Sequence, residues 1–351
     1  MWRRLQVVLV VAGFVGTACG SSVTAGDTSA IPGASGTVWV TERTPGSSTV
    51  TAFDAATGTV LGTTAVGSRP IGITHPHGTK YVYSSDESAN QLSVIDPETV
   101  TVVKTIPMGL GPHHLMSSPN GRYIYVGEFG SNYVGVVDTN LNERVAGYLA
   151  DPNTTARTHA VWITADGKDL YATNTHVVRS TMGNIVKFDA LTGERLWNFE
   201  VGKDPSEILV TANRKVGYVS IRGENKIVVL NLTGALPVVI GEAEANNEPD
   251  TLSLTNDGKT LVVGLRAPST GPARMALIDT MTLTTSYVLM PGHTITGHQW
   301  LSANSRYTFI AVEKPGALVV IDNEKASVVT EYPYPTGGTQ PHGVFYESSV
   351  S

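Results

Sequence analysis

The strongest constraint on the fold of this chain is a short sequence motif that recurs seven times between residues 70 and 344. Each copy is a turn followed by a strand-like run, as in Pro70-Ile71-Gly72-Ile73. The copies begin at Pro70, Pro112, Thr158, Pro205, Pro249, Gly297 and Pro341, with successive spacings of 42, 46, 47, 44, 48 and 44 residues. A period of this length over many copies is typical of repeat folds such as propellers, whose blades are arranged around an axis.

Each copy also contains three further strand-like runs. The second run is rich in Tyr and Val, as in Tyr81-Val82-Tyr83, and a fourth run occurs at 102–106. The third run ends in an acid or amide expected to cap a turn, at Asp54, Asp96, Asp138, Asp189, Asn231, Asp279 and Asp322. Four runs in seven copies predict an all-β, seven-bladed β-propeller with four antiparallel strands per blade.

The two ends of the repeat region predict how the ring closes. The region opens with a second-type run at 38–40 and ends with a first-type run at 342–345. The first blade should therefore combine three N-terminal strands with one C-terminal strand. Such a splice leaves no free sheet edge.

Composition limits the function classes. The chain has 24 Lys+Arg against 30 Asp+Glu, a net charge of −6, which argues against a nucleic-acid binder and against binding to an anionic membrane surface. Cys19 is the only cysteine, so an intramolecular disulfide and a thiolate metal cluster are both excluded. We expect a monomeric globular domain.

The N-terminal residues indicate export. Arg3-Arg4 precede an apolar run at 7–15 that is too short to span a bilayer. Gly16-Thr17-Ala18-Cys19-Gly20 resembles the lipobox of bacterial lipoproteins, although Gly16 stands where Leu or Val is usual. The resemblance implies that Cys19 is lipidated and anchors the protein to the membrane of the cell envelope. Cleavage without lipidation, giving a secreted or periplasmic protein, is the alternative.

These features divide the chain into three parts. Residues 1–18 are predicted to be a lipoprotein-type signal peptide, 19–36 a flexible Gly/Ser/Thr-rich tether, and 37–351 the propeller.

The repeat resembles a known family. The runs Leu92-Ser93-Val94-Ile95-Asp96 and Tyr123-Ile124-Tyr125-Val126 are similar to YVTN-repeat β-propellers, and the resemblance covers essentially all of 37–347. It implies the propeller fold but no single activity, because that family contains surface-layer proteins, binding proteins and domains of redox enzymes.

One position of the repeat predicts a site. The residue after each opening turn should line the mouth of the central channel, and it is histidine in four copies: His113, His159, His298 and His342. His114 follows His113 directly. A neighbouring ring, at the ends of the second strands, carries Glu42, Asp86, Glu128, Asn174, Arg222, Arg266 and Glu313.

Converging imidazoles with carboxylates behind them are typical of transition-metal sites, because the carboxylate accepts the second ring N–H and orients the ligand. We therefore expect a copper, iron or zinc ion at the mouth, held by His113, His114, His159, His298 and His342. The His113-His114 pair resembles that of the nitrous oxide reductase propeller, which holds copper. The copper domain of that family is missing here, so its activity is not implied. The haem d1 propellers are a further resemblance.

Three functions follow from this site. The first is an exported binding protein whose histidine-rich mouth holds a metal and takes a small molecule or an extracytoplasmic protein as partner. The second is a metal-dependent redox or hydrolytic enzyme acting on a small molecule, with Glu128, Glu207 or Asp250 as acid or base. The third is a cell-surface interaction scaffold with incidental histidines.

Two cofactor classes are excluded by motif. The sequence has no c-type haem Cys-x-x-Cys-His motif. Gly258-Lys259-Thr260 mimics the end of a phosphate loop, but Ser253 stands where its first glycine should be, so no nucleotide site is expected.

Overall fold

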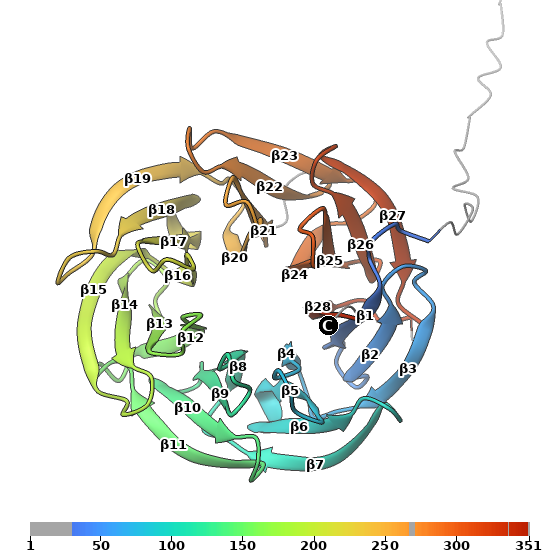
Figure 1. Cartoon of the computed structure of the whole chain (residues 1–351), viewed down its shortest axis with the longest axis horizontal. Helices are drawn as coiled ribbons and strands as arrows, with labels where there is room; N and C mark the ends of the chain where they lie inside the picture. Colours follow the sequence, from blue (N-terminus) through green and yellow to red (C-terminus); the bar gives the residue numbers. More distant parts are fainter. Residues whose placement is uncertain (1–29, 267–270, 336, 350–351) are drawn as a thin grey trace, which may run out of the picture. The chain divides into compact units, whose positions relative to one another are not determined.

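The propeller predicted from the repeat is confirmed. The computed structural model describes residues 30–266, 271–335 and 337–349. It contains seven four-stranded antiparallel sheets arranged as blades around a central axis (Figure 1). The predicted signal peptide, Cys19 and the part of the tether up to residue 29 lie outside the described residues. Within the described part of the chain, no helix has the length and apolar character needed to cross a membrane.

Each blade has one innermost strand at the channel, followed outward by three more. From the inside out, blade 1 consists of β28 (Pro341–Ser348), β1 (Gly36–Glu42), β2 (Thr49–Asp54) and β3 (Val60–Ala65). Blade 2 consists of β4 (Pro70–Thr74), β5 (Val82–Asp86), β6 (Gln91–Asp96) and β7 (Thr101–Pro107). Blade 3 consists of β8 (Pro112–Ser117), β9 (Tyr123–Glu128), β10 (Tyr133–Asp138) and β11 (Glu143–Leu149). Blade 4 consists of β12 (Ala156–Ile163), β13 (Asp169–His176), β14 (Met182–Asp189) and β15 (Arg195–Lys203).

The remaining blades have the same order. Blade 5 consists of β16 (Pro205–Val210), β17 (Val216–Ile221), β18 (Lys226–Asn231) and β19 (Val238–Glu244). Blade 6 consists of β20 (Pro249–Leu254), β21 (Thr260–Leu265), β22 (Ala273–Asp279) and β23 (Thr285–Met290). Blade 7 consists of β24 (Ile295–Leu301), β25 (Tyr307–Glu313), β26 (Ala317–Asp322) and β27 (Ser327–Pro333). Two single turns of 3-10 helix, η1 (Glu87–Ala89) and η2 (Arg222–Glu224), follow β5 and β17.

The hydrophobic core lies between the blades. Seven clusters of buried side chains each draw on two neighbouring blades, as where Tyr83 and Leu92 of blade 2 meet Ile124 and Val126 of blade 3. The second strands β5 and β13 are buried along their whole length, with apolar residues in the first half and polar residues toward the end near the mouth. The outer strands alternate between exposed and half-buried residues, as β3 does.

The ring closes as predicted. β28 pairs antiparallel with β1, with Trp39 opposite Phe345 and Val38 opposite Tyr346. The packed chain begins ahead of residue 37, because Ile31 and Ala34 are buried in the cluster between blades 7 and 1.

The turn acids act as the sequence predicted. Asp279 Oδ1, for example, accepts hydrogen bonds from the backbone N–H groups of Met281 and Thr282. Asp54 and Asp322 make the same pair of contacts in their own turns.

A β-bulge recurs in the innermost strand of every blade and positions the site. In blade 5, Pro205 pairs with Ile221 and Ile208 with Val219, so the inner strand has one residue more than its neighbour. Equivalent shifts occur in the other six blades. A bulge interrupts the ladder and redirects a side chain. In this chain the bulged residues include the histidines of the repeat.

Candidate functional site

The histidines predicted to share the mouth do meet there. The ring of His113 stacks on that of His114 with centroids 4.8 Å apart, and His159 lies 4.5 Å from His113 and 4.7 Å from His114. His298 lies 4.3 Å from His114, and His342 lies 4.3 Å from His298. Five imidazoles from four blades therefore form one contiguous group, the histidine cluster.

The cluster is buried but incompletely hydrogen-bonded. His114 is 6% exposed and His159 2% exposed, and the other three rings are also buried. Three buried ring nitrogens, His113 Nδ1, His114 Nε2 and His298 Nε2, have no hydrogen-bond partner within the described part of the chain. Buried polar atoms without a partner are rare in native proteins, and an unplaced ion or ligand is one explanation for them.

His159 is the best-oriented member of the cluster. Its Nδ1 lies 2.9 Å from the backbone carbonyl oxygen of Ser206 and donates to it. Its Nε2 accepts a hydrogen bond from Arg222 Nη1 at 3.3 Å. Donation from Nδ1 to a carbonyl oxygen fixes the tautomer in which Nε2 carries the lone pair. Arg222 uses this lone pair in the structure, so Arg222 would have to release Nε2 before His159 could bind a metal.

Burial keeps the cluster neutral. Desolvation lowers the pKa of His114 to about 4; the charge of Asp250 opposes this shift, and the charges of Arg222 and Arg266 add to it. Desolvation likewise holds the pKa of His113, His159, His298 and His342 well below the usual value. The rings therefore carry no charge at neutral pH, which is the form that binds metals.

The acids expected to support the histidines lie elsewhere, and that part of the prediction was wrong. Glu42, Asp86 and Glu128 accept backbone N–H groups of Gln340, Gly67 and Gly109, in the loops that lead into the inner strand of their own blades. Glu313 pairs with Arg43 at 2.7 Å. These four side chains order the loops around the mouth instead of orienting the rings of the histidine cluster.

The three residues proposed as acid or base, Glu128, Glu207 and Asp250, have different surroundings. Glu128 forms an ion pair with Arg144 at 3.0 Å, which directs its carboxylate away from the role of acid or base. Glu207 lies 3.9 Å from His114, too far for a hydrogen bond, and accepts the backbone N–H of Leu252. Desolvation raises the pKa of Glu207 to about 8.

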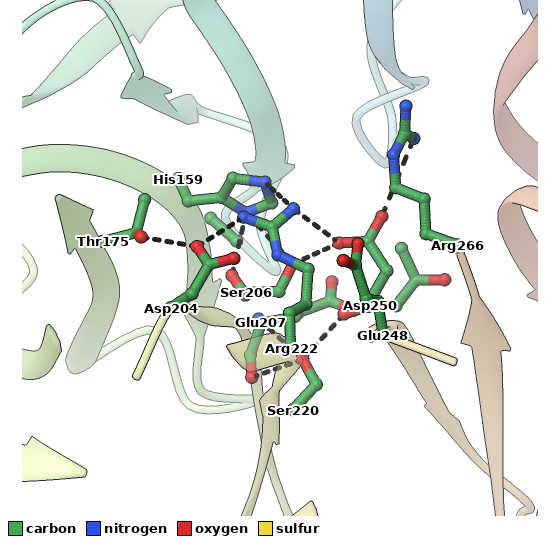
Figure 2. A network of polar contacts seen from close by, with 12 residues as sticks. His159, Thr175, Asp204, Ser206, Glu207, Ser220, Arg222, Glu248, Asp250 and Arg266 are labelled. Carbon is green, nitrogen blue, oxygen red and sulfur yellow. Dashed lines mark hydrogen bonds and ion pairs between the residues drawn. The ribbon is translucent and has the colours of Figure 1, made fainter. Parts of the chain in front are cut away.

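Asp250 is the ionised acid of the site. Its carboxylate accepts a hydrogen bond from Ser206 and lies 3.3 Å from Arg222 and 3.9 Å from Arg266 (Figure 2). Burial opposes its ionisation, but the two guanidinium groups outweigh burial and hold its pKa well below the usual value. Arg222 also contacts Asp204 at 3.0 Å. The acids nearest the cluster thus come from the inner strands, as Glu207 and Asp250 do, and from η1, where Glu87 lies 3.7 Å from His113 Nε2.

A cavity of about 120 Å³ opens beside the cluster. It is lined by Arg43, Arg69, Glu87, His113, Phe129, His159, Arg222, Asp250, Arg266 and His342. Four of these residues, Arg43, Arg69, Glu87 and Phe129, were not predicted from the sequence. The sequence signal that could have identified three of them is their place in the repeat. Arg43 and Glu87 follow the ends of second strands, and Arg69 precedes an opening proline.

Three histidines satisfy a geometric criterion for a metal site. One ring nitrogen each of His113, His114 and His159 can be chosen so that all lie within 4.8 Å of one another. Ligands 2.0–2.1 Å from one tetrahedral ion would be about 3.3 Å apart. The rings must therefore approach somewhat further to share an ion, and the cluster has the donor set that copper, zinc or iron accepts.

The fold and site together define a seven-bladed propeller with a buried, polar channel mouth. The chain belongs to the YNCE-like beta-propeller family, whose family model matches residues 3–346. This membership confirms the propeller resemblance drawn from the repeat.

Solved structures show the same fold at low sequence identity. Hydrazine synthase of Kuenenia stuttgartiensis is 18% identical with a TM-score of 0.69, covering 91% of this chain and 99% of that one. The periplasmic gluconolactonase PpgL of Pseudomonas aeruginosa is 15% identical with a TM-score of 0.69, covering 89% and 99%. The dihydro-heme d1 dehydrogenase NirN is 19% identical with a TM-score of 0.60, covering 90% and 75%. Comparison with curated protein sequences gave no significant match.

Proposed function

We propose that this protein is an exported, lipid-anchored binding protein that holds a transition metal at the mouth of its propeller. His113, His114 and His159 would be the ligands, with His298 and His342 beside them. The proposal is supported chiefly by three buried, neutral imidazoles that converge from two blades, two of them with a nitrogen that has no partner among the described residues. Imidazole suits Cu, Zn and Fe, and a metal held there would supply a Lewis-acidic centre for a bound partner.

The proposed location rests on the N-terminal sequence. A positive start, a short apolar run and the lipobox-like segment ending at Cys19 are the features of an exported lipoprotein. The partner at the mouth would be a small molecule or an extracytoplasmic protein, bound by a monomeric domain.

A second candidate function is a metal-dependent enzyme acting on a small molecule. Glu207 favours it, because a carboxyl group with a pKa of about 8 beside the cluster keeps a proton at neutral pH and can act as a general acid. Loss of turnover in Glu207→Gln with unchanged metal content would support the enzyme over the binding protein. Incidental histidines on a scaffold fit the site less well, because the rings are buried and converge.

The test of the metal site is elemental analysis of the full chain, purified without a histidine tag. We expect near-stoichiometric copper, zinc or iron in the wild type and loss of it in His113→Ala/His159→Ala. His77→Ala/His176→Ala is the matched control, since it removes two histidines outside the cluster and should keep the metal.

Circular dichroism of each variant checks that the propeller is folded. Wild-type protein that takes up none of the three metals, even after incubation with each ion, would refute the proposal. Equal loss of metal in the two double variants would also refute it, since binding would then not be specific to the cluster.

A further inference from the structure

The cavity beside the histidine cluster is surrounded by guanidinium groups from four blades. Arg43 follows β1, Arg69 precedes β4, Arg222 begins η2 and Arg266 follows β21. The strand register places Arg222 and Arg266 at the same repeat position as Arg43, one residue beyond the partner of the opening residue of the inner strand. The other four blades have Glu87, Phe129, Thr175 and Glu313 there. This position is therefore arginine in three of the seven blades and is not a feature of every blade.

The charge of the cavity lining is positive. Its four arginines face two acids, Glu87 and Asp250, which gives 4 − 2 = +2. The histidines add no charge because burial lowers their pKa. Arg43 and Arg222 also pair with Glu313 and Asp204 just outside the lining, and with these two acids counted the sum is 4 − 4 = 0.

The arginines are close enough to oppose one another. Burial lowers the pKa of Arg43, and the nearby charges of Arg266 and Arg69 lower it further, against the effect of Glu313. Concentrating like charges in a buried site is unfavourable, and an anion placed among them relieves the repulsion.

The site also contains unused donors. Arg43 has a side chain only 8% exposed, and its Nε has no acceptor within the described residues. Arg222 Nε also has no acceptor within the described residues. A guanidinium group has five N–H donors in a planar fork, which matches the two oxygens of a carboxylate or another oxyanion.

We propose that this cavity binds a small oxyanion through Arg43, Arg69, Arg222 and Arg266. The volume of about 120 Å³ leaves room for a ligand of only a few non-hydrogen atoms, such as a short carboxylate or an inorganic oxyanion. His113, His159 and His342 line the same cavity and would lie beside the anion.

This inference goes beyond the metal and does not require it. A metal and an oxyanion bound together would each offset part of the other's charge. Anion binding by metal-free protein separates the two proposals, because either can fail while the other holds.

The test is calorimetric titration of the metal-free full chain at constant ionic strength. Formate and acetate form the carboxylate arm, nitrate and phosphate the inorganic arm, and chloride the reference. We expect at least one oxyanion to bind more tightly than chloride, and the arm that does identifies the source of the ligand. Arg266→Gln should weaken that binding at least tenfold.

Arg306→Gln is the matched control. This substitution also removes one positive charge, but from an arginine that is paired with Asp322. Both residues lie outside the cavity lining, so anion binding should be unchanged. If Arg266→Gln does not fold, Arg69→Gln replaces it, because the Arg69 side chain is half exposed and better able to tolerate change. Failure of all four oxyanions to bind, or equal weakening by Arg306→Gln, would overturn the proposal.

Discussion

At the scale of single residues, the surroundings of two carboxyl groups at the mouth shift their pKa values in opposite directions. Asp250 is held ionised by Arg222 and Arg266, whereas burial makes the charged form of Glu207 costly. Both side chains lie on inner strands of neighbouring blades, β20 and β16. Pairs of acids with opposed pKa shifts are typical of sites that bind or transfer protons.

The raised pKa of Glu207 makes stability depend on pH. The carboxyl group keeps its proton in the folded protein up to about pH 8, whereas the unfolded chain loses it near 4.5. Its contribution to stability is complete below 4.5 and is lost as the pH rises toward 8. Glu207→Gln keeps the acceptor for the N–H of Leu252 and has no proton to lose.

We therefore predict that Glu207→Gln becomes more stable relative to wild type between pH 5 and pH 8, by an amount on the order of a few kcal/mol. Urea unfolding at several pH values measures this difference. Glu143→Gln, at an exposed position of β11, should show no such trend. A difference for Glu207→Gln that stays constant with pH would contradict the assignment.

The histidines of the site could be predicted from sequence, and the arginines only in part. His113, His159, His298 and His342 occupy one repeated position, so the repeat period was enough to predict that they lie close together. The location of the supporting acids could not be inferred, because whether Glu128 points to the channel or to the Gly109 N–H depends on the path of a loop. Loop conformation leaves no periodic signal in the sequence.

At the scale of strands and blades, stability comes from packing between neighbouring sheets. Phe188 on β14 is fully buried in the cluster shared by blades 3 and 4, within reach of the Tyr148 ring of β11. The centroids of these two rings are 6.0 Å apart. Each such cluster fixes one blade against the next.

Phe188→Ala should lower the free energy of unfolding by about 3–5 kcal/mol, because it removes a buried ring and leaves a cavity. Leu191→Ala is the matched control, since Leu191 is 76% exposed and its truncation should change stability by no more than about 0.5 kcal/mol. Chemical denaturation measures both. Equal effects of the two substitutions would show that the inter-blade cluster does not carry this energy.

The strands themselves could be predicted from sequence, but the bulges could not. Turn acids and apolar second runs located the blades correctly. The extra residue in each inner strand depends on pairing with the neighbouring strand, a contact that a period of about 44 residues does not encode. That residue is nevertheless what places side chains at the mouth.

At the scale of the whole molecule, one strand closes the ring. β28 is the innermost strand of blade 1 and packs against β4 and β24 of the adjacent blades. It also carries His342 into the cluster. The domain therefore depends on its last strand both for closure and for its site.

Deletion of residues 341–351 should abolish the cooperative unfolding transition, because it exposes the edge of β1 and the cores on both sides of blade 1. Deletion of residues 350–351 alone is the control and should leave the transition in place. Thermal unfolding followed by circular dichroism distinguishes them. A cooperative transition at the wild-type temperature after the longer deletion would show that β28 is dispensable.

The position of His342 sets an order of events in biosynthesis. A ribosome makes residues 341–348 after the other strands of the propeller, so the first four histidines of the cluster exist in the nascent chain before the fifth. The complete histidine cluster forms only after β28 has docked against β1. Whatever occupies the mouth in its final form must then be acquired in the compartment where the finished chain folds, from the pool of ions and small molecules present there.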